Sequence, residues 1–257
     1  MAKAKPKTIH NDVVAIKQLV NFAVRRKMIH ENPLAELKLK KPKNSPQPYW
    51  MRDQVELILK STSPRYQALF HFLADTGTRI GEARWLTWDD VDFSNKFVHI
   101  RPKDGWQPKT GDQRVIHLSD DLHHVLSKLP RSSKWVFTAP RTERFPTGDR
   151  QISARRALAH LKTVLKKIGL PGHLHTFRHS FISHALIAGA KESVVREWVG
   201  HVDPEIMKIY IHIADKYSRS AMHEILPGKG PSHGGDGAHA GGSDCAQNVH
   251  RKEDCHE

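Results

Sequence analysis

The amino-acid sequence predicts a mainly α-helical protein with a small antiparallel β-sheet, which places it in the α+β class. From residue 51 to about residue 226, most segments carry apolar side chains at helical spacing. Two short runs rich in β-branched residues, 96–101 and 113–118, interrupt this pattern, and the turn-forming stretch PKDGWQPKTGD separates them. We therefore expect these two runs to pair as a hairpin.

The first predicted helix covers residues 8–28, where apolar side chains fall on one face and Thr8 or Asn11 can cap the start. Residues 38–48, KLKKPKNSPQP, combine four lysines with three prolines and show no periodicity, which is typical of an extended linker. A domain boundary near residue 45 follows. The main body is then expected to contain helices at 53–61, 64–77, 79–86, 153–169 and 173–186.

The charge of the chain indicates a polyanionic partner. Lys and Arg number 41 against 27 Asp and Glu in 257 residues, a formal net charge of +14. Nucleic acid is the first candidate. No apolar run approaches the roughly 18 residues needed to cross a bilayer, and the start lacks the apolar core of a signal peptide. We expect a soluble intracellular protein with no membrane partner.

Cationic side chains gather at the end of the first predicted helix and in the linker. Such runs are often only solvated faces, but in a basic protein they also suit DNA phosphates. The candidate DNA-binding residues are Arg25, Arg26, Lys27, Lys40, Lys41 and Lys43.

The stretch 173-HLHTFRHSFISHAL-186 sets histidines and an arginine into an apolar helix. His175 and His179 have the spacing of two zinc ligands on one helical face, but Thr176 stands where a general-base Glu would be. Arg178 would also bring a fixed positive charge beside a metal ion. His175 and Arg178 can alternatively donate together to a phosphate, and the remaining alternative is a solvated polar face.

Two other segments carry polar residues at loop and helix starts. Arg79 follows a Thr-Gly-Thr turn and opens a helix, where free backbone N–H groups favour an anion. His201 follows a glycine in a loop, and the next helix, which begins near Pro204, carries Tyr210.

These segments together resemble the tyrosine recombinase family, also called phage integrases. The motifs are T-G-x-R-x-x-E, H-x-x-R-H, G-H and a Tyr followed by x-H, and the resemblance runs from about residue 8 to 217. It implies the catalytic fold of DNA breaking and rejoining enzymes. It also implies a site-specific recombinase, or integrase, that cleaves and rejoins DNA through a covalent 3′-phosphotyrosyl intermediate, without ATP, metal or another cofactor.

The resemblance implies a role for each matching residue. Arg79 and Arg178 are the two catalytic arginines, His175 and His201 accompany them, and Tyr210 is the nucleophile.

The family also uses a lysine in a β-hairpin turn. The matching segment 108-PKTGDQRVIHL-118 points to Lys109, and Lys103 at the other end of the hairpin is the competing choice. Glu82 matches the family's acidic position and would orient an arginine or histidine, while His179 is expected to pack behind the catalytic groups.

Composition and the resemblance together set the expected organisation, and the resemblance sets the partners. Residues 1–45 are a remnant of the helical DNA-binding domain plus a basic linker, 46–226 are the catalytic domain, and 227–257 are a disordered Gly- and His-rich tail. The partners are double-stranded DNA, three more copies in a tetramer on two synapsed sites, and an accessory directionality factor of a mobile element. The expected location is the cytoplasm, at the nucleoid.

Two other functions stay open at this point: a type IB topoisomerase-like activity, and a non-catalytic basic DNA-binding protein with a decayed site. No metal site is expected. The acidic residues Asp89, Asp90 and Asp92 fit cap and turn positions, and Cys245 and Cys255 with His250 supply only part of a zinc-knuckle spacing.

Overall fold

The computed structural model describes residues 5–38, 40, 48–109, 111, 113–143 and 146–225, and the side chains of these residues up to Ser218. The chain divides into two units, Met1–Ser218 and Arg219–Glu257. The domain boundaries at 45/46 and 226/227 stay predictions. Lys41, Lys43 and the tail residues Cys245, His250 and Cys255 lie outside the described residues.

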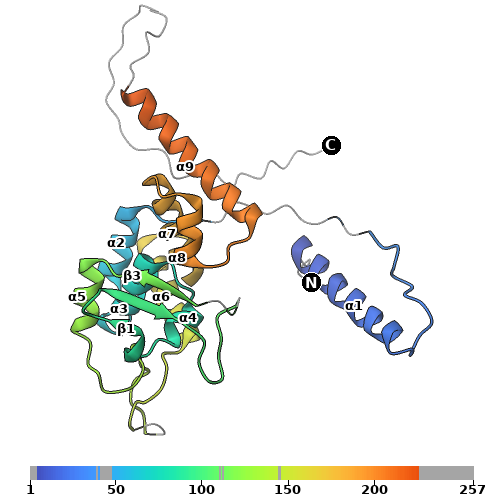
Figure 1. Cartoon of the computed structure of the whole chain (residues 1–257), viewed down its shortest axis with the longest axis horizontal. Coiled ribbons are helices and arrows are strands. Elements are labelled where there is room, and N and C mark those ends of the chain that lie inside the picture. The colour runs from blue at the N-terminus through green and yellow to red at the C-terminus, as the bar shows by residue number, and fades with distance from the viewer. Residues whose placement is uncertain are drawn as a thin grey trace, which may run out of the picture. The chain divides into compact units, whose positions relative to one another are not determined.

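The described residues form nine α-helices, one 3₁₀ helix and three strands, so the mainly helical fold class is confirmed (Figure 1). In chain order the elements are α1 (Pro6–Arg25), α2 (Arg52–Ser61), α3 (Pro64–Thr76), α4 (Ile80–Arg84), η1 (Trp88–Asp90), β1 (Val91–Asp92), β2 (Phe97–Ile100), β3 (Arg114–His117), α5 (Asp120–Ser127), α6 (Ala154–Ile168), α7 (Leu174–Ile187), α8 (Glu192–Val199) and α9 (Pro204–Ile225).

The helix α1 begins two residues before the predicted start. Pro6 occupies its first turn, and Lys5 precedes it as an N-cap without a side-chain hydrogen bond. Proline at the first helical position has its backbone torsion already set for a helix, so Thr8 and Asn11 lie inside the helix and do not cap it. No side chain of α1 is buried.

The predicted hairpin is confirmed. The strands β2 and β3 pair antiparallel with Val98 opposite Ile116 and Phe97 opposite His117, and β1 adds to the other edge of β2. Val98 and Ile116 are both buried, so one face of this small sheet packs on the helices.

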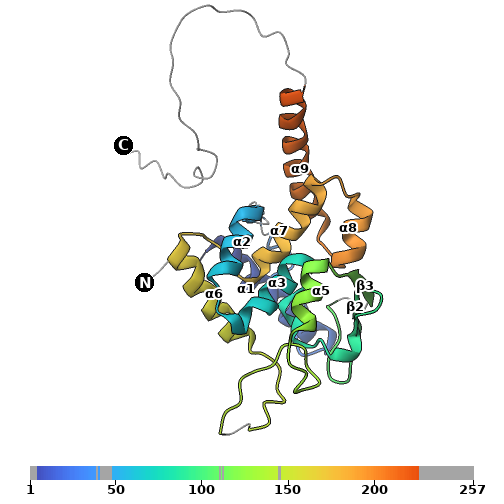
Figure 2. The same ribbon diagram turned by 90° about the vertical axis from the view of Figure 1, so that its left-hand side faces the viewer.

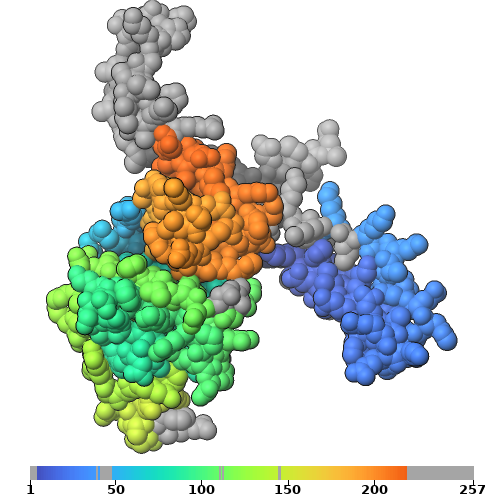
Figure 3. Space-filling model, in the orientation of Figure 1, coloured from blue at the N-terminus to red at the C-terminus, as the bar shows by residue number. Residues whose placement is uncertain are grey.

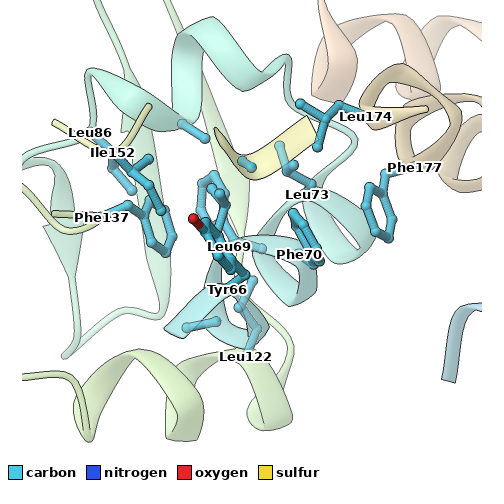
Figure 4. Packing of buried hydrophobic residues seen from close by; sticks show 14 of the residues in the cluster. Tyr66, Leu69, Phe70, Leu73, Leu86, Leu122, Phe137, Ile152, Leu174 and Phe177 are labelled. Carbon is cyan, nitrogen blue, oxygen red and sulfur yellow. The ribbon is translucent and has the colours of Figure 1, made fainter. Parts of the chain in front are cut away.

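Most of the hydrophobic core lies around α3, whose residues Leu69, Phe70, Phe72 and Leu73 are at most 1% exposed. Figure 4 shows Leu69, Phe70 and Leu73 packed with side chains of α5 and α7, and Figure 2 shows α3 among the neighbouring helices. Because seven of the thirteen residues of α3 are buried, the helix is a fixed base for the turn that follows it and carries Arg79.

Trp50, just after the predicted linker, anchors the start of α7. Its indole N–H donates to the Pro171 carbonyl at 2.8 Å, its backbone N–H donates to Ser180 Oγ at 2.8 Å, and its ring meets Phe177 edge-on at 4.9 Å. A Cβ at Gly172 would lie 2.4 Å from the Trp50 ring, so only glycine fits this approach. The tryptophan therefore fixes where α7 begins.

A second, smaller cluster joins α7, α8 and α9. Ile182, Val195, Val199 and Met207 pack around Tyr210, which is 1% exposed. The side chains of α8 and the beginning of α9 form one continuous orange surface in the space-filling view (Figure 3). This packing decides where the helix with Tyr210 lies.

Candidate active site

Arg178 is the most enclosed cation of the site, with 3% of the residue exposed. One of its terminal nitrogens donates to the Gly77 carbonyl at 2.9 Å and the Val199 carbonyl at 2.6 Å, and the other donates to the His201 carbonyl at 3.1 Å. Desolvation, followed by the charge of Arg79, lowers its pKa to about 9. The guanidinium is thus still charged at neutral pH, and three carbonyls hold it in one orientation.

Arg79 precedes α4 and lies half-buried at the same place. Its Nη2 donates to the His201 carbonyl at 2.7 Å and its Nη1 to Glu82 Oε1 at 3.2 Å. The guanidinium groups of Arg79 and Arg178 therefore converge on one oxygen atom, the carbonyl of His201. Segments that lie far apart in the chain build this arrangement, because the turn between α3 and α4, the helix α7 and the turn after α8 each contribute to it.

Glu82 is buried beneath the arginines, with 3% of the residue exposed. It accepts hydrogen bonds from the backbone N–H of Arg79 at 2.9 Å and from the side chain of Arg114 at 2.6 Å. Burial on its own would raise the pKa of Glu82, but the hydrogen bonds and positive charges of Arg114 and Arg79 lower it. Glu82 is thus an ionised carboxylate that binds Arg79 and Arg114.

An open cavity of about 390 Å³ lies beside these groups, and Arg79, Glu82, Trp106, Lys109 and His175 are among its lining residues. The Lys109 side chain is exposed. His175 reaches the surface, yet desolvation, followed by the charges of Arg178 and Arg79, lowers its pKa to about 4. The imidazole is therefore neutral at pH 7, and the cavity has cationic and neutral donors on its walls.

Lys103 has a different environment from Lys109. Its ammonium group bonds to the carboxylate of Asp90, which is fully buried and also accepts from Arg101 at 2.8 Å. Asp90 also accepts from the backbone N–H of Thr87 at 2.9 Å, as expected for a cap residue. Lys103 thus neutralises a buried carboxylate, whereas Lys109 lines the cavity.

His201 contributes its backbone carbonyl to the site, and Tyr210 contributes its side-chain hydroxyl. The carbonyl of His201 receives the two arginines, while its side chain is exposed. The hydroxyl of Tyr210 is buried and hydrogen-bonded to Nδ1 of His179. Desolvation raises the pKa of Tyr210, although the charge of Arg178 opposes this. His179 is therefore the described site residue whose side chain hydrogen-bonds to Tyr210.

Two residues of this region are not among the sequence predictions. Arg114 binds Glu82, and His173 caps α7 by accepting the backbone N–H of His175 at 3.1 Å on its ring nitrogen. Arg114 shares a face of β3 with the buried Ile116, since side chains alternate along a strand. The sequence signal for Arg114 is therefore an arginine two residues before a buried apolar residue of the same strand.

The candidate DNA-binding residues that the structure describes are all exposed: Arg25, Arg26, Lys27 and Lys40.

Among the described residues, no three His, Cys, Asp or Glu side chains are grouped as metal ligands. No described helix is both long and apolar enough to cross a membrane.

The pKa of His179 predicts how stability depends on pH. Desolvation, followed by the nearby histidines and Arg178, lowers this pKa from 6.5 to about 3, so the unfolded chain binds the proton more readily. Stability from this residue is therefore present above pH 6.5 and lost as the pH falls towards 3. Between pH 7 and pH 5 we expect His179 to contribute a loss of about 2 kcal/mol in the free energy of unfolding, in addition to the loss from His175.

Urea denaturation at pH 7, 6 and 5 measures this loss. His179→Gln should make the dependence shallower, while replacing the exposed His124 with Gln should leave it as in the wild type. An unchanged slope in His179→Gln would contradict the prediction.

Comparison with known proteins gives the family. The sequence model of the phage integrase family matches residues 49–217 of this chain. A tyrosine recombinase of Thermosipho africanus is 23% identical over 225 residues, which cover 85% of this chain and 76% of the relative. Tyrosine recombinase XerC of Chlamydia trachomatis is 27% identical over 233 residues, with 86% of this chain and 71% of the relative covered.

Solved structures share the fold. The Tn1549 transposon integrase in complex with transposon right end DNA superposes with a TM-score of 0.64 and 19% identity, covering 85% of this chain and 79% of that chain. The XerA recombinase superposes with a TM-score of 0.55 and 21% identity, covering 75% of this chain and 69% of that chain.

The helical fold with its small sheet is the fold of solved integrases and recombinases. The family match covers more than half of the chain, and the protein belongs to the phage integrase family. It is a tyrosine-type site-specific DNA recombinase, as the sequence predicts.

Proposed function

We propose that Tyr210 attacks a DNA phosphodiester and forms a 3′-phosphotyrosyl link, while Arg79 and Arg178 hold the phosphate. The observation that carries this proposal is the convergence of both guanidinium groups on the single His201 carbonyl oxygen, at 2.7 and 3.1 Å. Because this carbonyl holds the two guanidinium groups side by side, their remaining N–H groups can bind the nonbridging oxygens of one phosphate. His175 and His201 supply further donors at the edge of this position.

The chemistry of phosphoryl transfer explains why cations must be fixed there in advance. As phosphorus becomes five-coordinate, negative charge gathers on its nonbridging oxygens, and preorganised donors stabilise that charge without rearranging. Arginine stays protonated throughout. The new phosphotyrosyl bond is similar in energy to the bond broken, so a 5′-hydroxyl of another strand can reverse the step without ATP.

Tyr210 cannot react from the position that it occupies here. It is 1% exposed, and its raised pKa opposes the loss of the phenolic proton that the attack requires. We propose that DNA binding moves the start of α9 and separates Tyr210 from His179. Near the phosphate, Arg178 and Arg79 favour the phenolate.

The departing 5′-oxygen must gain a proton, and we propose Lys109 as the donor. Lys109→Ala should then slow cleavage about 100-fold, the usual size of a general-acid contribution. A duplex with sulfur in place of the leaving oxygen should restore the rate, since a thiolate leaves without protonation. Single-turnover cleavage of both duplexes measures these rates.

Lys103→Ala is the matched control for this prediction. It should reduce stability, because Asp90 is fully buried and loses a cationic partner, but the folded variant should cleave at nearly the wild-type rate. A larger loss of cleavage in Lys103→Ala than in Lys109→Ala would make Lys103 the donor.

Covalent trapping tests the proposed function. The protein is incubated with a pool of randomised duplexes that carry a nick, which lets the cleaved end diffuse away and leaves the adduct trapped. We expect a denaturation-resistant adduct whose tryptic phosphopeptide contains Tyr210. An adduct on another residue would refute the role of Tyr210, and no adduct from any duplex would favour a DNA-binding protein without activity.

The wider assembly belongs to the same proposal. We propose that four copies act on two synapsed sites, with an accessory directionality factor, in the cytoplasm at the nucleoid. Membership of the family supports this arrangement. The exposed cations at the end of α1, together with Lys40, Lys41 and Lys43, are proposed to bind DNA phosphates, which would make affinity fall with salt.

A further inference from the structure

We infer that Arg114 is a positioning residue, which ties the catalytic arginine Arg79, the turn with His201 and the hairpin with Lys109 into one arrangement. This inference rests on the proposed function, since it concerns how those groups are aligned for cleavage.

The hydrogen bonds of Arg114 reach two separate parts of the site. Its Nε donates to the Trp198 carbonyl at 2.8 Å, and its terminal nitrogens donate to both oxygens of Glu82, at 2.6 and 3.3 Å. Its side chain is 8% exposed and that of Glu82 is 2% exposed. A guanidinium has donors in a fixed planar fork, so binding both partners fixes the distance between them.

Each partner of Arg114 leads to a catalytic group. Glu82 holds Arg79 through the backbone N–H at 2.9 Å and through Nη1 at 3.2 Å. Trp198 lies near the end of α8, three residues before His201, whose carbonyl receives Arg79 and Arg178. Arg114 itself begins β3, five residues after Lys109. One side chain therefore joins the three segments.

Electrostatics give Arg114 a second effect on the same groups. Among the described residues, four groups act electrostatically on Glu82: Arg79 at the start of its own helix, Arg114 on β3, and Arg178 and His175 on α7. Removing Arg114 takes away its strongest hydrogen-bonding cation, so the pKa of Glu82 should rise. A protonated Glu82 would no longer attract Arg79, and cleavage should then fall at acidic pH where the wild type is still active.

Arg114→Gln tests the inference by single-turnover cleavage and DNA affinity across pH 5 to 8. We expect cleavage to slow about 100-fold, as for a small misplacement of catalytic groups, with DNA affinity unchanged. The loss should deepen as the pH falls. Arg114→Lys keeps the charge and should restore the pH profile, but not the full rate, because an ammonium cannot span both partners.

Arg101→Gln is the matched control, because Arg101 also pairs with a buried carboxylate, Asp90, at 2.8 Å. A wild-type rate and pH profile in Arg114→Gln would overturn the inference, as would an equal loss with the same pH profile in Arg101→Gln. If Arg114→Gln does not fold, Arg114→Lys decides: slower cleavage at unchanged DNA affinity supports the inference, and an unchanged rate overturns it.

A measurement without DNA separates this inference from the proposed function. If the wild type forms no adduct, the proposed function fails, but amide exchange still shows whether Arg114 holds the turn after α8 in place. The Gly200 amide, which donates to the Arg196 carbonyl at 2.8 Å, should exchange faster in Arg114→Gln than in the wild type and Arg101→Gln. Equal exchange in all three proteins would overturn the inference.

Discussion

Tyr210→Phe is expected to abolish the covalent adduct with DNA. Phenylalanine fills the same buried space among Ile182, Val195 and Met207, so the helix α9 should keep its packing. The attacking oxygen is gone, however, and no water can form the covalent link in its place. Removing the nucleophile of a covalent mechanism costs on the order of a millionfold in rate. Denaturing electrophoresis of labelled DNA should show no shifted band, while DNA affinity remains.

Tyr217→Phe is the control for this variant. Tyr217 lies on the same helix, is 38% exposed, and has its hydroxyl 3.3 Å from that of Tyr49. Its loss removes a tyrosine hydroxyl from α9 without touching His179, so adducts should form as in the wild type. An adduct that persists in Tyr210→Phe and disappears in Tyr217→Phe would assign the nucleophile to Tyr217.

Arg178→Lys is expected to lose both cleavage and stability. The one nitrogen of a lysine cannot take the places of both terminal nitrogens of Arg178, so at least one of the carbonyls of Gly77, Val199 and His201 loses this donor. A buried carbonyl without a donor costs about 1–3 kcal/mol. The free energy of unfolding should fall by about 3 kcal/mol. Losing one preorganised donor to the transition state should slow cleavage about 100-fold or more.

Arg196→Lys provides the comparison for Arg178→Lys. Arg196 also donates to a carbonyl of the turn after α8, that of Val202 at 2.9 Å, but it pairs with Glu192 and lies outside the cavity. Urea denaturation should show a small loss of stability, and cleavage should change little. A wild-type cleavage rate in folded Arg178→Lys would contradict a role of Arg178 at the phosphate.

Local patterns in the sequence predicted much of the fold. The helix periodicity located α3, α6 and α7 to within a few residues, and the two β-branched runs predicted the pairing of β2 with β3. These features depend on neighbours within a few residues of each other. The helices α5 and α8, with eight residues each, were not predicted, whereas the short α4 was predicted two residues too long, to residue 86. So short a helix shows the apolar period little more than twice.

The candidate site was predicted only as a set of residue types. Spacing within 173–186 left a metal, a phosphate and a solvated face open, and the resemblance to the family selected the phosphate. The hairpin offered Lys109 and Lys103, and the buried Asp90 now accounts for Lys103. The catalytic roles of these residues stay proposals that the substitutions above test.

The sequence by itself determined the family, the local elements and the charge that suits DNA, because each of these depends only on composition, periodicity or short motifs. Only the tertiary structure decided that Arg79 and Arg178 meet on the His201 carbonyl and that Arg114 clamps Glu82. It also decided that Tyr210 lies buried. The physical reason is the distance along the chain: Arg79 and His201 are 122 residues apart, and no local pattern records which carbonyl a guanidinium finds after packing.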